Sequence, residues 1–126
     1  MEKIRALVVD DDKKFCTSLG NCLRISFGCE VSLCYSGSEA IQQLENGIYH
    51  LVLIDIKMPG INGFIVLEKA IQKYPEVISF IISGLNDAAI SNKAEEMGAW
   101  FVSKPVEFPA LEHLLKMSLK EKKLIP

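Results

Sequence analysis

The amino-acid sequence predicts an α/β fold with a doubly wound parallel sheet, for two reasons. Five short apolar runs rich in β-branched or aromatic residues recur along the chain, and segments with helical spacing of apolar residues lie between them. Most of these runs lack the polar alternation of a half-exposed strand, as expected when helices cover both faces of a parallel sheet. Five such units in 126 residues fit a flavodoxin-like (βα)5 sheet with strand order 2-1-3-4-5, because barrel closure would need more units.

The expected strands are residues 4–9, 31–33, 51–54, 77–82 and 100–102. Each run is bounded by polar or helical segments, and the regular alternation implies right-handed crossovers between parallel strands. The sequence therefore predicts a single domain over residues 1–120, followed by a C-terminal tail or the start of a linker at 121–126.

Apolar residues three or four positions apart predict the helices. They are Phe15, Leu19 and Leu23; Ala40, Ile41 and Leu44; Phe64, Leu67, Ile71 and Tyr74; Ile90, Ala94 and Met97; and Leu111, Leu114, Leu115 and Leu119. The fourth stripe is the weakest and has smaller residues, which predicts a helix held loosely enough to shift. Asp12, just before the first stripe, is expected to cap that helix at its amino end.

The composition indicates a globular protein and argues against several function classes. Hydrophobic residues make up 49% and charged residues 24% of the chain, which argues against a disordered protein. The net charge of −2 and the lack of a long basic block argue against direct nucleic-acid binding. The four cysteines form no CxxC pair and are expected to be reduced, and no run approaches the ~18 apolar residues of a membrane span. We therefore expect a soluble cytoplasmic protein without membrane association.

Polar residues follow four of the five expected strands. The first run is followed by Asp10 and Asp11, and the third by Asp55. The fourth run leads into Ser83 and the fifth into Lys104. Because the carboxyl ends of parallel strands meet at one edge of the sheet, these side chains should share a single crevice.

The chemistry of this set points to phosphoryl transfer. Clustered carboxylates suit Mg²⁺, which prefers oxygen ligands and keeps positions open for water and phosphate oxygens. A lysine ammonium and a serine hydroxyl can both meet phosphoryl oxygens, and phosphoryl transfer depends mainly on positioning and charge neutralisation. A carboxylate can itself be the nucleophile and form an aspartyl phosphate.

These motifs resemble the receiver domain of bacterial two-component response regulators, over about residues 3–119. The matching stretches are VVDDD, LIDIKMPGINGF, FIISG and SKP, in this order and each at a strand end. The resemblance implies that Asp55 accepts a phosphoryl group from a phosphohistidine of a partner histidine kinase or phosphotransfer protein. It implies that Asp11 is a direct Mg²⁺ ligand, that Asp10 acts partly through water, and that Lys57 contributes its backbone carbonyl to the metal.

The resemblance also implies a switch. Ser83 matches the hydroxyl that moves toward the phosphoryl group, and Lys104 matches the lysine that pairs with it. Lys57 and Leu85 occupy positions that tune dephosphorylation in similar proteins.

The switch aromatic is less directly assigned, because the segment from Gly98 to Lys104 is one residue shorter than is usual in this family. Counting back from Lys104 selects Phe101, whereas counting forward from Gly98 selects Val102, which cannot serve. We favour Phe101, since the strand end is anchored and a loop can absorb a deletion. The bond between Lys104 and Pro105 is cis in similar proteins.

The resulting prediction is a phosphorylation-dependent signalling receiver. Phosphorylation of Asp55 would switch the surface of the fourth helix, fifth strand and fifth helix, and so control an output domain or a partner protein. The chain would catalyse only its own phosphotransfer and dephosphorylation, and would not be a conventional enzyme. A receiver-like interaction module that is never phosphorylated is the second reading that the sequence allows.

Two more protein classes with a related fold fit the sequence less well. A phosphatase of the haloacid dehalogenase type needs a second aspartate two residues after the first, where this chain has Lys57. A flavodoxin needs a phosphate-binding loop after the first strand, where three aspartates would repel a phosphate.

Overall fold

The computed structural model describes residues 3–84 and 88–126, and in them strands and helices alternate along the chain. The strands are β1 (Arg5–Val9), β2 (Glu30–Cys34), β3 (Leu51–Asp55), β4 (Ile78–Ser83) and β5 (Trp100–Ser103). The helices are α1 (Lys13–Phe27), α2 (Gly37–Asn46), α3 (Gly63–Lys73), α4 (Ala88–Glu96) and α5 (Phe108–Glu121). All four strand pairs are parallel, in the order β2-β1-β3-β4-β5, which confirms the predicted topology.

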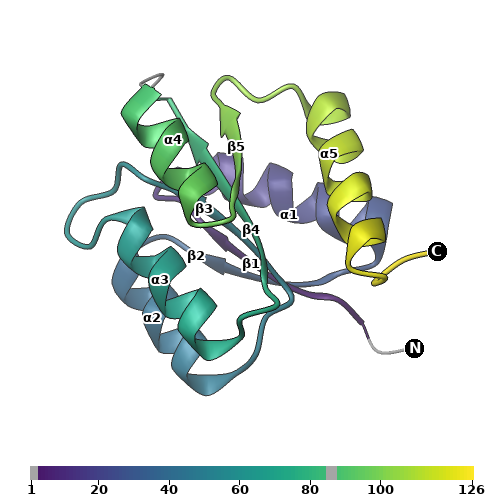
Figure 1. Ribbon diagram of the computed structural model, residues 1–126, viewed down its shortest axis with the longest axis horizontal. Helices are drawn as coiled ribbons and strands as arrows, with labels where there is room; N and C mark the ends of the chain where they lie inside the picture. The colour runs from purple at the N-terminus through teal and green to yellow at the C-terminus, as the bar shows by residue number, and fades with distance from the viewer. Residues whose placement is uncertain (1–2, 85–87) are drawn as a thin grey trace.

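Helices cover both faces of the sheet. Helices α2, α3 and α4 pack on one face, and α1 and α5 pack on the other (Figure 1). Successive strand residues point to opposite faces, so adjacent residues belong to different cores. Ile54 and Ile81 face α3 and α4, whereas Leu53 and Phe80 face α1 and α5, and all four are buried. Burial on both faces explains why these strands read as continuous apolar runs.

Short polar side chains define the starts of three helices. The Asp12 carboxylate accepts a hydrogen bond from the Phe15 amide at 3.1 Å, which confirms Asp12 as the cap of α1. Ser36 caps α2 in the same way, and Asn62 caps α3. Gly28 ends α1 with φ of 64°, a left-handed conformation that favours glycine.

The strand register brings the predicted site residues to one edge. Val9 pairs with Ile54, so Asp10 and Asp55, which follow them, are neighbours. Beyond Asp55, β4 ends at Ser83 opposite Ser103 of β5. Lys104 directly follows Ser103, so Asp10, Asp55, Ser83 and Lys104 lie at the carboxyl edge of four neighbouring strands, as the sequence predicts.

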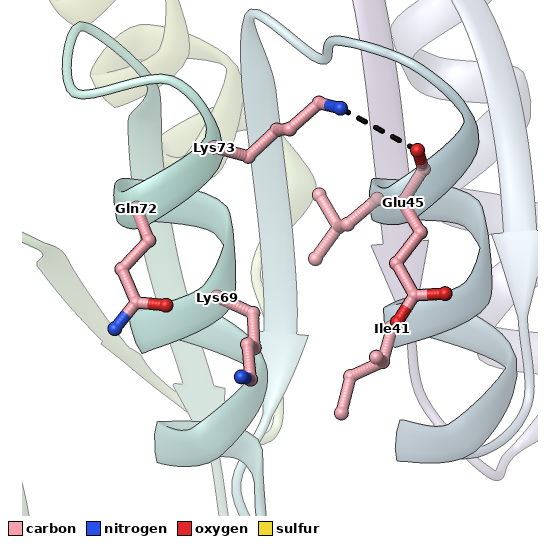
Figure 2. Close-up of a pocket in the computed structure, with 6 residues that line it drawn as sticks. Ile41, Glu45, Lys69, Gln72 and Lys73 are labelled. Carbon is pink, nitrogen blue, oxygen red and sulfur yellow. Dashed lines mark hydrogen bonds between the residues drawn. The ribbon is translucent and has the colours of Figure 1, made fainter.

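A separate groove of about 350 Å³ lies between α2 and α3 (Figure 2). It is lined by Ile41, Leu44, Glu45, Lys69, Gln72 and Lys73. Lys73 Nζ reaches across it and donates to the Glu45 carbonyl oxygen at 3.4 Å. None of these residues belongs to the carboxyl-edge set, so the groove is distinct from the predicted site.

The end of the chain continues past α5. Leu124 and Ile125 are half-buried and pack against the core between the sheet, α1 and α5. Among residues 3–84 and 88–126, no helix has both the length and the apolar character that a membrane crossing requires.

Candidate functional site

Three carboxylates gather at the carboxyl edge of the sheet. One oxygen each from Asp10, Asp11 and Asp55 lies within 4.8 Å of the others. Asp10 is 1% exposed and Asp55 is 6% exposed, whereas Asp11 is open to solvent. Like charges held this close disfavour one another, and carboxylate oxygens are the ligands that Mg²⁺ prefers. The donor set therefore fits a magnesium ion.

The ammonium group of Lys104 supplies a positive charge beside these carboxylates. Its ammonium nitrogen lies 2.7 Å from Asp10 Oδ2 and 3.8 Å from Asp55 Oδ2. Burial alone would lower the pKa of Lys104, but the hydrogen bond with Asp10 and the charges of Asp55 and Asp10 outweigh it and raise the pKa. Lys104 is thus charged at neutral pH and bridges the two buried acids.

Asp55 has the properties of a nucleophile. Burial and the neighbouring charge of Asp10 raise its pKa from 3.8 to about 6, although Lys104 and a hydrogen bond from the Lys57 amide pull the other way. At pH 7 to 8 the carboxylate is still ionised. Its proton affinity is nevertheless higher than that of an exposed aspartate, and a more basic oxygen is the better nucleophile.

The loop after Asp55 is fixed by a close approach of α3. A Cβ on Gly63 would collide with the carbonyl oxygen of Asp55 and would stand only 2.9 Å from Ile56 Cα, so this position requires glycine. The Gly63 amide also donates to the Ile56 carbonyl at 3.2 Å. The first turn of α3 therefore holds the chain on which Asp55 sits.

A cleft of about 320 Å³ opens beside Asp55. It is lined by Asp55, Lys57, Gly84 and Lys104. Ser83 is fully buried at the end of β4, and its carbonyl accepts a hydrogen bond from the Lys104 amide at 2.9 Å. The ends of β4 and β5 are therefore tied together next to the acids. The metal-binding role of the Lys57 carbonyl stays a prediction, and Leu85 lies outside the described residues.

Phe101 lies on the other side of β5 from its neighbours. It is half-buried against the core under α4, opposite Ile81, whereas Val102 packs toward α1 and α5. Trp100 stacks on Phe80 with ring centroids 5.8 Å apart. Phe101 also lines a groove of about 450 Å³ beside α4. This position suits a residue that responds to α4, and its switch role stays a prediction. The predicted cis bond between Lys104 and Pro105 is present.

The sequence did not reveal one neighbour of the site. Lys104 Nζ lies 4.7 Å from the centroid of the Phe15 ring. In the sequence, Phe15 is simply the first member of an apolar helical stripe. A cation over an aromatic ring has no signature in sequence spacing when the two residues come from opposite ends of the chain.

Comparison with known proteins agrees with this geometry. A family model of the response regulator receiver domain matches residues 6–116. The transcriptional regulatory protein ZraR of Salmonella typhimurium is 33% identical over 118 residues, covering 93% of this chain and 26% of that protein. A cyclic di-GMP phosphodiesterase of Thermotoga maritima is 30% identical over 117 residues, covering 92% of this chain and 31% of the relative. The chain thus spans about a quarter to a third of these relatives.

Solved structures show the same fold. A CheY-like receiver domain protein from Methanospirillum hungatei superposes with a TM-score of 0.89 at 30% identity, covering 97% of this chain and 98% of that one. The beryllofluoride-activated receiver domain of DrrB has a TM-score of 0.85 at 23% identity, covering 94% and 99%. At that identity the second likeness concerns the fold alone.

Proposed function

This chain belongs to the response regulator receiver family, and we propose that it carries its signal as a phosphoryl group on Asp55. The observation that supports this proposal is the buried, ionised carboxylate of Asp55 beside two further acids and one lysine. The proposed donor is the phosphohistidine of a sensor histidine kinase or of a phosphotransfer protein.

The transfer requires one bond exchange. An oxygen of the Asp55 carboxylate forms a bond to phosphorus while the phosphorus–nitrogen bond of the donor breaks, and the bonding electrons leave with the imidazole nitrogen. Lys104, which bridges Asp10 and Asp55 before transfer, is within reach of a new phosphoryl oxygen. In a separate hydrolysis step, a water oxygen forms a bond to phosphorus while the bond between phosphorus and the Asp55 oxygen breaks, which releases inorganic phosphate and the Asp55 carboxylate. The chain then turns over only its own phosphoryl group and is not an enzyme for a separate substrate.

Asp10, Asp11 and Asp55, with the carbonyl of Lys57, would hold the Mg²⁺ that receiver domains generally bind at an acidic pocket. When bound, that ion supplies positive charge for the oxygens of the transferred group. The Asp10 carboxylate is itself held in place, because it is buried and hydrogen bonded to Lys104 and to the Asp12 amide.

We further propose that phosphorylation changes the surface formed by α4, β5 and α5, through which an output domain or effector would be controlled. Two observations support this. The Lys104 amide ties the end of β5 to Ser83, so a movement of either side chain toward a phosphoryl group acts on both strands. Helix α4 buries only Ala94 among its described residues, so little packing resists its displacement. The four cysteines are free thiols, which supports a reducing, cytoplasmic location.

The test is phosphorylation by radiolabelled acetyl phosphate. We expect the wild type to incorporate phosphate with Mg²⁺, and to lose incorporation with EDTA or when Asp55→Asn removes the nucleophile. Asp12→Asn is the matched control, because it removes an acid of the same turn that caps α1 outside the cluster, and asparagine caps equally well. The label should be released by hydroxylamine, as an acyl phosphate is. Amide exchange in residues 88–103 should change on phosphorylation.

Other outcomes contradict parts of the proposal. A wild type that incorporates no phosphate would favour an interaction module that is never phosphorylated. If the Asp55→Asn variant still incorporated phosphate, the phosphoacceptor would be a residue other than Asp55. Phosphorylation without any change of exchange in residues 88–103 would contradict the proposed output surface alone.

A further inference from the structure

The contact between Lys104 and Phe15 adds an unassigned residue to the phosphoacceptor site. A lysine ammonium over an aromatic face is attracted by the negative charge of the ring face, at centroid distances up to about 6 Å. Here the distance is 4.7 Å. The same ammonium meets Asp10 at 2.7 Å and Asp55 at 3.8 Å. The ring is thus a third contact of the cation that faces the proposed nucleophile.

Phe15 is itself held in place. Its amide donates to the Asp12 carboxylate at 3.1 Å, so the cap that starts α1 also fixes the backbone of Phe15. Its ring is half-buried against the core between the sheet, α1 and α5. The neighbouring Cys16 donates from its thiol to the Asp10 carbonyl at 3.2 Å, which ties the first turn of α1 to the end of β1. The ring therefore has a defined position relative to the acids.

Phe108 extends this arrangement to α5. The Phe15 and Phe108 rings lie 6.3 Å apart at 41°, a tilted packing that aromatic pairs favour. Lys104 follows β5 and Phe108 begins α5, so both ends of the connection between them contact Phe15. One residue of α1 thus contacts both the phosphate-facing lysine and the start of the last helix.

We propose that Phe15 is a positioning residue for the phosphoryl-transfer reaction, because its ring holds the Lys104 ammonium beside Asp10 and Asp55. This inference rests on the proposed function. A lysine side chain has many rotamers and loses much freedom when it is held in one place. The ring favours the rotamer in which the ammonium faces the site, and it excludes water from part of the ammonium surface. Without the ring, the ammonium spends less time where a phosphoryl oxygen would arrive.

The experiment compares Phe15→Leu, which keeps an apolar side chain, with Phe15→Tyr, which keeps the ring. We expect Phe15→Leu to slow phosphorylation by acetyl phosphate about two- to tenfold, the range that such a contact supports, and Phe15→Tyr to restore the wild-type rate. Tyr35→Leu is the matched control, since it removes the ring under Lys13, at 5.3 Å, and leaves Lys104 untouched. This control should keep the wild-type rate.

A spectroscopic measurement separates positioning from folding. In protein labelled at lysine, the ring current of Phe15 should shift the protons next to Lys104 Nζ in the wild type and in Phe15→Tyr, but not in Phe15→Leu. Equal phosphorylation rates in wild type and Phe15→Leu would overturn the inference, and so would an equal loss of rate in Phe15→Tyr. A wild type that takes up no phosphate, with the ring-current shift present, would instead contradict the proposed function.

Discussion

Polar side chains lie at both edges of the sheet, the one at the amino ends of the strands and the one at the carboxyl ends. The two edges differ in how these side chains are paired. At the amino edge, the Arg5 guanidinium lies 4.7 Å from the centroid of the Tyr49 ring and donates to the Ile48 carbonyl at 3.1 Å. The Tyr49 hydroxyl is hydrogen bonded to Ser32 and Gln43 side chains, each at 3.0 Å. The polar groups of this edge thus satisfy one another within the protein.

At the carboxyl edge, three carboxylates face one ammonium. Burial raises the pKa of Asp55 to about 6, which means that its charge is held at a cost in folding free energy. If the polar groups of this edge were fully paired with one another, negative charge would not exceed positive charge in this way. The contrast supports the proposal that the carboxyl edge binds a cation and a phosphoryl group, whereas the contacts at the amino edge contribute to stability.

The largest effect on stability should come from Lys104. Lys104→Met keeps the length of the side chain but leaves the buried Asp10 carboxylate without its partner at 2.7 Å. Removing one member of a buried ion pair is strongly destabilising, and we expect a loss of about 2–4 kcal/mol in the free energy of unfolding. Urea denaturation at pH 7.5 in EDTA measures it, since no divalent cation then replaces the ammonium.

Lys122→Met provides the matched control. Lys122 pairs with Glu76 at 3.1 Å, but the two side chains are 44% and 68% exposed. An exposed pair contributes little, so this change should cost less than about 0.5 kcal/mol. Equal losses for the two variants would contradict the view that the carboxyl edge depends on Lys104 for its charge balance.

The next effect is a gain in stability at the same edge. Asp55→Asn removes a carboxylate whose folded pKa lies above its ordinary value of 3.8, so the variant should be more stable than wild type by about 1–3 kcal/mol at pH 7.5. The Asp55 carboxyl binds its proton more tightly in the folded state than in the unfolded state. Its contribution to the free energy of unfolding of the wild type therefore falls as pH rises from about 4 to about 6. The difference between variant and wild type should therefore be small at pH 4, grow through this window, and stay constant above it.

Urea denaturation of both proteins across pH 4–8 measures the difference. Asp12→Asn is the control, because Asp12 is exposed and caps α1. A difference that is independent of pH, or a destabilised Asp55→Asn, would contradict a raised pKa for Asp55.

Most of the fold and the site acids could be predicted from the sequence, because each has a local signal. Burial on both faces makes a strand an apolar run, and the carboxyl ends of parallel strands must meet, so Asp10, Asp55 and Lys104 could be brought together without coordinates. The cap at Asp12 also followed from a single turn of helix. The predicted features, namely the strands, the site residues at their ends and the cap of α1, all depend on backbone periodicity and on topology.

The remaining features depend on side-chain packing between distant segments. The ring of Phe15 under Lys104, and the approach of Gly63 to the chain after Asp55, arise from how α1 and α3 dock on the sheet. No periodic pattern in the sequence predicts either contact. The strand that carries Phe101 could be predicted from its apolar run. The stacking of Trp100 on Phe80, on the face of the sheet opposite to Phe101, could not.

A smaller effect than those at the carboxyl edge should come from the amino edge. Tyr49→Phe removes the hydroxyl that is bonded to Ser32 and Gln43 but keeps the ring under Arg5, so we expect a loss of about 0.5–1.5 kcal/mol. Ser32→Ala removes only one of the two bonds and should cost less. Phosphorylation by acetyl phosphate should keep its wild-type rate in both variants, because Tyr49 precedes β3 at the end of that strand opposite Asp55, and Ser32 lies in β2, which is not adjacent to β3. A slowed reaction in Tyr49→Phe would show that the two edges are coupled through the sheet.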